Sequence, residues 1–343
     1  MVVRVDSLGS SAGWLRDTQF DRFFIFGIAA FAIATGLIVV AQPALFIPIL
    51  VADLWLLGYH HVVSTFTRLC FDAQSFRQNR FLLTGLPLIV FLSVAALTYG
   101  VGAWTITTVY LYWQWFHYTR QSWGIAQAYR RKARTVVVDG RWAPQIVFYL
   151  PPLWGILYRS HQAPATFLGI ELRTIPVSGL LVDIVGIAAL AAMVWWVLSH
   201  ISAWRNRELP VAYTMYQVSH FAVFLVGYVF IRNIDVGWLV VNIWHNAQYI
   251  AFVWLYNNNR YSSGIDPGAR FLSTLSQKRN VWLYLGLCLG ISTVSYAAVD
   301  SLVTAIVAPV IVFQATNFHH YIVDGLIWKR RRSAASQNLR IAS

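Results

Sequence analysis

The segment from Asn242 to Tyr261, NIWHNAQYIAFVWLYNNNRY, decides how this chain folds. Most of it is apolar or aromatic, and about 20 such residues in a helix cross the hydrocarbon layer of a bilayer. His245 lies inside this run, with Gln248 and Tyr249 close by. Because polar groups in hydrocarbon are costly unless a partner satisfies them, the segment predicts a membrane-spanning helix that carries a polar site.

The composition of the whole chain agrees with that prediction. Of its 343 residues 58% are hydrophobic and 11% are charged, whereas a soluble domain carries roughly 25% charged residues. We therefore expect an all-α, polytopic helix bundle that forms a single integral membrane domain over residues 1–343. The two cysteines, Cys70 and Cys288, lie far apart and indicate neither a disulfide framework nor a thiolate metal site.

Ten apolar stretches are long enough to be candidate transmembrane helices. The fifth is short and contains Pro151 and Pro152, so it is expected to be kinked or re-entrant. The ten stretches are 23–42, 45–66, 81–100, 103–127, 144–159, 178–202, 212–231, 237–257, 281–299 and 302–328.

The positions of the basic residues predict the orientation of these spans. With both termini cytoplasmic, all but three of the 26 Lys and Arg residues fall in cytoplasmic segments, and the exceptions are Arg159, Arg173 and Arg232. This asymmetry is typical of inner loops in membrane proteins. It explains the net charge of +13 without a nucleic acid partner. Residues 1–22 then form a cytoplasmic leader and residues 329–343 a basic cytoplasmic tail.

Seven of the nine histidines fall in the cytoplasmic half of the membrane, on five different spans. We expect them to be metal ligands, although each could instead be a separate interhelical hydrogen-bonding residue. The seven are His60, His61, His117, His220, His245, His319 and His320. His161 lies in an outer loop and His200 at a span end, and both are expected to be exposed to solvent.

Polar side chains share helix faces with these histidines. Residues three, four or seven apart lie on one face, so several could hold the imidazole rings as outer partners. Asp324 could be a direct ligand, an outer partner, or a carboxylate paired with Lys329 or Arg330. The outer partners expected are Asp53, Gln114, Gln217, Asn242, Gln248, Tyr249 and Asn317. Aromatic residues that flank the histidines could line a substrate tunnel or could only pack between helices, namely Trp113, Trp115, Trp123 and Trp244.

Many imidazoles at one depth suit zinc, copper or iron. Five to seven of them exceed one tetrahedral zinc site. They would serve a mononuclear or dinuclear non-haem iron centre, or haem b with paired axial histidines. A transporter that uses intramembrane histidines as a proton relay is a third possibility.

Two families of membrane iron enzymes provide resemblances. The pairs His60–His61 and His319–His320 resemble the ends of the histidine boxes of fatty-acid desaturases and hydroxylases, but the box spacing is not matched. In layout the chain resembles the Brp/Blh type of β-carotene-cleaving dioxygenase. The similar patches are GYHHVVSTF (58–66), WFHYTRQSWG (115–124), HNAQYIAFVW (245–254) and FHHYIVDGLIW (318–328).

The second resemblance implies iron ligands on four helices: His60 or His61, His117, His245 and His320. Separately, we expect a multi-pass protein of a bacterial inner membrane. We therefore expect a membrane-embedded, metal-dependent oxidoreductase or oxygenase that acts on a lipid or isoprenoid at the cytoplasmic leaflet. Its partners would be membrane lipids, a lipophilic substrate and a cytosolic electron donor. Haem-based electron transfer and proton-coupled transport remain the alternatives.

Overall fold

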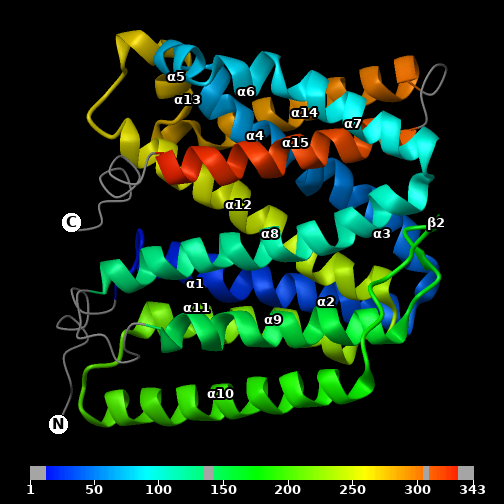
Figure 1. Ribbon diagram of the computed structural model, residues 1–343. Coiled ribbons are helices and arrows are strands. Elements are labelled where there is room, and N and C mark those ends of the chain that lie inside the picture. The colour runs from blue at the N-terminus through cyan, green and yellow to red at the C-terminus, as the bar shows by residue number, and fades with distance from the viewer. Residues whose placement is uncertain (1–12, 134–141, 304–308, 331–343) are drawn as a thin grey trace.

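Long helices make up almost all of the described chain, which covers residues 13–133, 142–303 and 309–330 of the computed structural model (Figure 1). The helices run along a common axis. Figure 1 shows the β hairpin (β1, Thr166–Phe167, and β2, Ile170–Glu171) at one end of the bundle, and α5 (Ala73–Gln78) and α13 (Arg270–Leu275) at the other. The expectation of an all-α fold is confirmed.

The first half of the chain forms four long helical segments, and several of them are built from consecutive pieces. These are α1 (Thr18–Arg22), η2 (Phe23–Gly27) and α2 (Ile28–Ala41); η3 (Pro43–Leu45), α3 (Phe46–Asp53), η4 (Leu54–Gly58) and α4 (Tyr59–Cys70); α6 (Arg80–Thr84) and α7 (Leu86–Gly100); and α8 (Ala103–Lys132).

The second half adds six long segments and two short turns. The long segments are α9 (Ala143–Gln162), α10 (Gly179–Arg205), α11 (Val211–Phe224) with η5 (Leu225–Phe230), α12 (Ile234–Arg260), α14 (Val281–Val303) and α15 (Pro309–Arg330). The short turns are η6 (Pro267–Ala269) and η7 (Lys278–Asn280). A helix therefore occupies each of the ten apolar stretches. The stretch predicted at 302–328 differs at its start, since α14 continues to Val303 and residues 304–308 lie outside the described part of the chain.

Four helical segments are long and apolar enough to cross a membrane, which identifies the chain as a candidate membrane protein. They are Thr18–Ala41, Pro43–Cys70, Gly179–Arg205 and Lys278–Ala298. Much of their surface is apolar and exposed, as expected where lipid takes the place of a protein neighbour. Six of the predicted spans do not meet the same standard of length and hydropathy in the described residues, and α7 is a shorter apolar helix.

The opening segment forms the central helix, α12. Its side chains are buried on nearly all sides, against α2, α4, η4 and η5. A helix that is apolar around its whole circumference belongs in the interior of a bundle. Asn233 caps its start by accepting a hydrogen bond from the N–H of Val236 at 3.0 Å. The core position of α12 places His245 where other helices surround it.

The fifth segment, α9, is a continuous helix through both prolines. Its carbonyl at Pro152 accepts a hydrogen bond from the indole N–H of Trp115 at 2.8 Å. Neighbouring side chains that satisfy backbone groups near a proline are what allow it inside a buried helix. The helix packs against α10 along its length, so the expected re-entrant shape is wrong.

Arg159, near the end of α9, is fully buried and holds the end of η5. Its guanidinium donates to the carbonyls of Gly227 at 2.9 Å, Ile231 and Arg232 at 2.5 Å. The last carbonyls of a helix lack partners within it, and a cation satisfies both the hydrogen bonds and the helix dipole. Arg159 was expected in an outer loop, whereas it is a buried cap.

Candidate functional site

Four histidine rings meet in the interior, each from a different helix. His61 comes from α4, His117 from α8, His245 from α12 and His320 from α15, and all four are buried. The ring of His61 lies 4.5 Å from that of His320 and 5.4 Å from that of His245, between centroids. His117 lies 5.1 Å from His245 and 5.5 Å from His320. We call these residues the four-histidine cluster.

Two ring nitrogens of the cluster face each other. The Nε2 atoms of His61 and His320 are 3.0 Å apart. On the other side of its ring, His61 Nδ1 lies 2.7 Å from the carbonyl oxygen of Gly58. A carbonyl only accepts, so Nδ1 carries the proton and Nε2 of the neutral ring presents a lone pair. Gly58 is the last residue of η4, so the wide turn before α4 supplies the acceptor that orients His61.

A hydrogen-bonded chain orients His320 in the same way. Its Nδ1 lies 3.3 Å from the hydroxyl of Thr65, which donates to the hydroxyl of Tyr249 at 2.7 Å. Tyr249 in turn donates to the carboxylate of Asp324 at 2.6 Å, and the indole of Trp328 donates to the same oxygen at 2.7 Å. The Asp324 carboxylate at the end of this series of hydrogen bonds only accepts, so Tyr249 donates to Asp324 and Thr65 donates to Tyr249. Nδ1–H of His320 then donates to Thr65, and its Nε2 presents a lone pair.

The other two rings have unused nitrogens. The Nε2 atoms of His117 and His245 are buried and have no hydrogen-bond partner within the described residues. A buried nitrogen without a partner costs about 1 to 3 kcal/mol, so such atoms call for an explanation. Tyrosine rings hold both imidazoles in place: Tyr321 stacks on His117 at 4.3 Å, and Tyr118 lies 4.0 Å from His245.

A second polar chain connects α8, α12 and α3 beside the cluster. The amide of Gln114 donates to the hydroxyl of Tyr118 at 2.6 Å, and that hydroxyl donates to the side-chain oxygen of Asn242. Asn242 Nδ2 then donates to the Asp53 carboxylate at 2.5 Å. Asp53, Gln114 and Asn242 therefore reach the cluster through Tyr118, which packs on His245.

Three of the predicted ligands have other partners. Both nitrogens of His220 are engaged, Nδ1 with Ser122 and Nε2 with the carbonyl of Phe148, each at 3.0 Å. His319 directs Nε2 to the carbonyl of Leu82 at 2.7 Å. His60 directs Nδ1 to a carbonyl in its own helix at 3.3 Å. The structure thus brings together four of the seven predicted histidines. These four include one residue of each adjacent pair, His61 and His320.

Asp324 and the remaining predicted residues occupy different places. Asp324 is an outer partner of His320 through Tyr249 and Thr65, rather than a ring neighbour of the histidines. Gln217 accepts from Trp196, and Gln248 accepts from Tyr216, both away from the cluster.

The two histidines expected at the surface also differ from each other. His161 is exposed, as predicted. His200 is buried beside Trp196, whose carbonyl lies 2.9 Å from its Nδ1, so its expected exposure to solvent is wrong. The end of α10 packs against the bundle instead of projecting into solvent.

Sequence reasoning missed Thr65, Tyr118 and Tyr321 as residues that hold the cluster. Thr65 lies one helical turn after His61, and Tyr118 and Tyr321 each follow a cluster histidine directly. The four-residue spacing of Thr65 was a usable signal, because it places the hydroxyl on the face of His61. Neighbours in sequence point to different faces of a helix, so the tyrosines carried no such signal.

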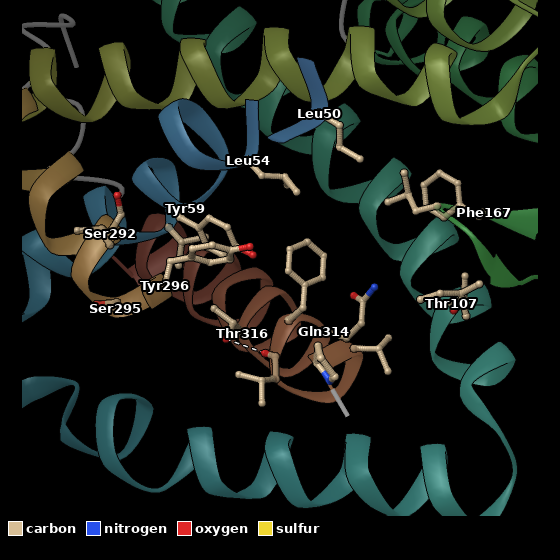
Figure 2. A pocket seen from close by; sticks show the side chains of 18 of the residues that line it. Leu50, Leu54, Tyr59, Thr107, Phe167, Ser292, Ser295, Tyr296, Gln314 and Thr316 are labelled. Carbon is tan, nitrogen blue, oxygen red and sulfur yellow. Dashed lines mark hydrogen bonds between the residues drawn. The ribbon is translucent and has the colours of Figure 1, made fainter. Parts of the chain in front are cut away.

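A cavity of about 550 Å³ lies between α3, α4, α8, α14, α15 and the β hairpin (Figure 2). Figure 2 shows Leu50, Leu54, Tyr59, Phe167 and Tyr296 directed into it. A second, separate cavity of about 20 Å³ lies next to the first and is lined by residues that include His61, Tyr118, Asn242 and Asn317. Neither is lined by the tryptophans predicted to form a tunnel, which pack elsewhere: Trp113, Trp115, Trp123 and Trp244.

Among the described residues, no group of three or more His, Cys, Asp or Glu side chains lies close enough together, as placed, to hold a metal ion. The closest approach in the cluster is the His61–His320 nitrogen pair. No family model, no curated protein and no solved structure matches this chain.

Proposed function

We propose that the four-histidine cluster binds one non-haem iron ion, and that the chain is a membrane-embedded oxidoreductase of the oxygenase type acting on a lipid or isoprenoid. The ligands would be the Nε2 atoms of His61, His117, His245 and His320. The observation that carries this proposal is the pair of facing Nε2 atoms in His61 and His320.

A positive charge between the two rings would stabilise the facing pair. Both Nδ1 atoms are held by acceptors, so two neutral rings would direct lone pairs at each other across 3.0 Å. A metal ion removes that repulsion. Two nitrogens bound side by side to one ion, at metal–nitrogen distances of about 2.1 Å, are themselves about 3 Å apart. The unpartnered Nε2 atoms of His117 and His245 supply two further donors.

The set of donors favours iron in a nitrogen environment. Outer hydrogen bonds from Gly58 and Thr65 are the kind that orient metal-bound imidazoles. Four histidines leave coordination positions free, and iron with free positions supplies oxidation chemistry with dioxygen. A haem iron would hold two axial nitrogens roughly 4 Å apart with a porphyrin between them, which the 3.0 Å spacing does not accommodate.

The membrane part of the proposal rests on the candidate spans and on charge. The long helical segments of the described chain run along a common axis (Figure 1), and the basic residues of the sequence concentrate in alternate connections between the predicted spans. We place both termini and the basic connections in the cytoplasm of a multi-pass inner-membrane protein. A cytosolic donor would then deliver electrons at the basic end, while lipophilic substrate arrives from the bilayer.

Metal analysis of the detergent-purified protein tests the proposal. We expect about one iron per chain by plasma mass spectrometry and no Soret absorption band. The His61→Ala/His320→Ala double variant, purified in parallel, should contain none. A haem spectrum, or a protein that is metal-free and fails to take up added Fe²⁺, would overturn the proposal. In the metal-free case the His61–His320 pair would share a proton, as expected of a transporter relay.

A further inference from the structure

We infer that the cavity of about 550 Å³ binds the hydrocarbon chain of an uncharged lipid, and that this lipid is the substrate of the metal centre proposed above. Only the statement that this lipid is a substrate rests on the proposed function. Binding of the lipid can be tested without it.

The lining defines the chemistry of the ligand. No Asp, Glu, Lys, Arg or His side chain is among the described residues that line the cavity. The polar groups there are neutral ones, such as the side chains of Ser292, Gln314 and Thr316. A phosphate or carboxylate placed among them would lose its hydration without gaining a cation, which is strongly unfavourable. A hydroxyl or carbonyl group can be satisfied by the same side chains.

The size of the cavity suits such a chain. Small-molecule pockets in proteins typically measure about 300 to 1,000 Å³, and most of their lining is apolar. Here leucine, valine, phenylalanine and tyrosine side chains from five helices and the hairpin surround the space (Figure 2).

The ligand would enter from the bilayer. Two of the helical segments around the cavity, Pro43–Cys70 and Lys278–Ala298, are candidate membrane spans. Their outer faces near the cavity carry exposed apolar side chains, including Val51 and Val294. In a membrane those faces contact lipid, so a hydrocarbon chain reaches the cavity without crossing water.

The large cavity lies next to a small one that reaches the four-histidine cluster. Five residues line both the large cavity and the small one, namely Leu54, Tyr59, Val62, Phe313 and Thr316. The small cavity then reaches His61. Its volume of about 20 Å³ holds roughly one water molecule, so the junction is narrow. The ring of Tyr59 stands at this junction, 4.7 Å from the ring of Tyr296 and 6.0 Å from that of Phe313.

Competition binding tests the inference. The probe is retinol, whose fluorescence reports its binding to the purified full-length protein. The competitors are geranylgeraniol and oleyl alcohol, and their charged counterparts geranylgeranyl diphosphate and oleate. We expect the alcohols to displace retinol at concentrations at least about tenfold lower than the charged compounds. The better of the two alcohols distinguishes an isoprenoid chain from a straight one.

A variant that fills the cavity locates the binding site. Ser295→Trp places a large ring at the cavity, and Ser295 is exposed enough to accept it without repacking the core. We expect retinol to bind at least about tenfold more weakly, with iron content unchanged. The matched control is Ile89→Trp on the exposed face of α7, which should bind as the unmodified protein does.

The outcomes separate this inference from the proposed function. His320→Ala should lose iron and still bind retinol. If the unmodified protein lacks iron yet shows the expected competition and the Ser295→Trp effect, the cavity inference stands and the metal centre falls. Equal competition by charged and uncharged lipids, displacement by phospholipid alone, or unchanged binding in Ser295→Trp would overturn the cavity inference.

Discussion

The Nε2 atoms of His61 and His320 lie 3.0 Å apart, although 259 positions separate the two residues in the chain. One belongs to α4 and the other to α15, so the pair joins the first and last parts of the bundle. Each ring is oriented from behind, by the carbonyl of Gly58 and by the hydroxyl of Thr65. Hydrogen bonds to the outer nitrogen of an imidazole are typical of rings whose other nitrogen binds a metal ion.

The first prediction concerns the ligands themselves. His320→Ala should lower the affinity for iron by about 100-fold or more, because a direct ligand matters at least as much as the outer partners that orient it. Iron content after dialysis against a chelator measures the loss. The matched control is the variant His319→Ala. The neighbouring ring of His319 hydrogen-bonds the carbonyl of Leu82 and stacks on Phe66, so its loss should leave the iron content unchanged. Equal iron content in the two variants would exclude His320 as a ligand.

The second prediction concerns the hydrogen-bonded chain behind His320. Tyr249→Phe removes the hydroxyl that accepts from Thr65 and donates to Asp324. The orientation of the ring is then less fixed, and iron affinity should fall about 10- to 100-fold, as for other outer partners. Competition with a calibrated chelator gives the affinity.

A matched control for that variant is Tyr216→Phe. Tyr216 is equally buried, and its hydroxyl bonds Ser122 and Gln248 instead of cluster partners. It should bind iron as the unmodified protein does. If both tyrosine variants bind equally well, the chain from Thr65 to Asp324 does not act on the metal.

The fold was largely predictable because bilayer thickness sets the length of an apolar helix. Within the described residues a helix lies in each of the ten apolar stretches, including the one with two internal prolines. The buried role of Arg159 was not predictable in this way. Its partners are carbonyls about 70 residues away, and backbone carbonyls leave no mark in a sequence.

The sequence predicted which helices carry the histidines of the site, but not which of their side chains face one another. Common depth selected seven histidines, but depth does not fix the direction of a side chain around the helix axis. His60 and His61 differ by about 100° on α4, and only His61 faces the other rings. The same rotation separates His319 from His320. The four tryptophans near the histidines line neither cavity for a related reason, since nearness in sequence to a histidine does not fix where a ring points.

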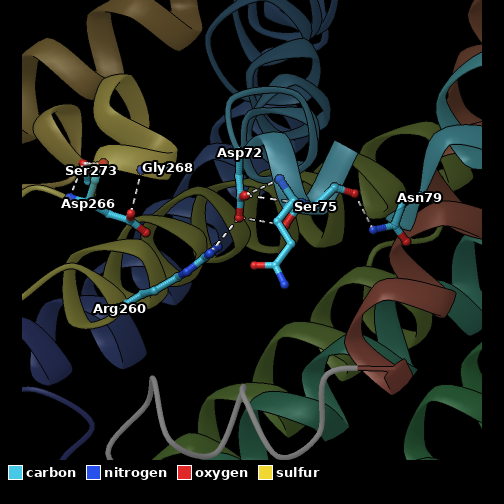
Figure 3. A network of polar contacts seen from close by, with 8 residues as sticks. Asp72, Ser75, Asn79, Arg260, Asp266, Gly268 and Ser273 are labelled. Carbon is cyan, nitrogen blue, oxygen red and sulfur yellow. Dashed lines mark hydrogen bonds and ion pairs between the residues drawn. The ribbon is translucent and has the colours of Figure 1, made fainter. Parts of the chain in front are cut away.

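Asp72, between α4 and α5, binds Arg260 at the end of α12 (Figure 3). Its carboxylate accepts from Arg260 at 2.6 Å and from the hydroxyl of Ser75 at 2.8 Å, and it caps α5 through the backbone N–H of Gln74 at 3.0 Å. Burial alone would raise the pKa of Asp72. The hydrogen bonds from Arg260 and Ser75 outweigh burial and lower the pKa below its usual value of 3.8.

The third prediction follows from the sign of that shift. A carboxyl group with a lowered pKa in the folded state stabilises the fold above pH 3.8, and this contribution is lost as pH falls through the lowered value. Asp72→Asn keeps a capping oxygen but loses the charge. At pH 7 it should be less stable by about 1 kcal/mol. The difference from the unmodified protein in thermal unfolding should persist down to about pH 4 and shrink as pH falls below 3.8, and a constant difference would refute the charge effect.

The last prediction concerns the buried cap made by Arg159. Arg159→Ala would leave the carbonyls of Gly227, Ile231 and Arg232 without their donor in a buried place. Each orphaned group costs about 1 to 3 kcal/mol, so the free energy of unfolding should fall by at least about 3 kcal/mol. Unfolding in detergent measures it against Arg173→Ala, since Arg173 forms an exposed ion pair worth at most about 1 kcal/mol. If both variants lose the same small amount, the carbonyls have other donors and η5 ends without help from α9.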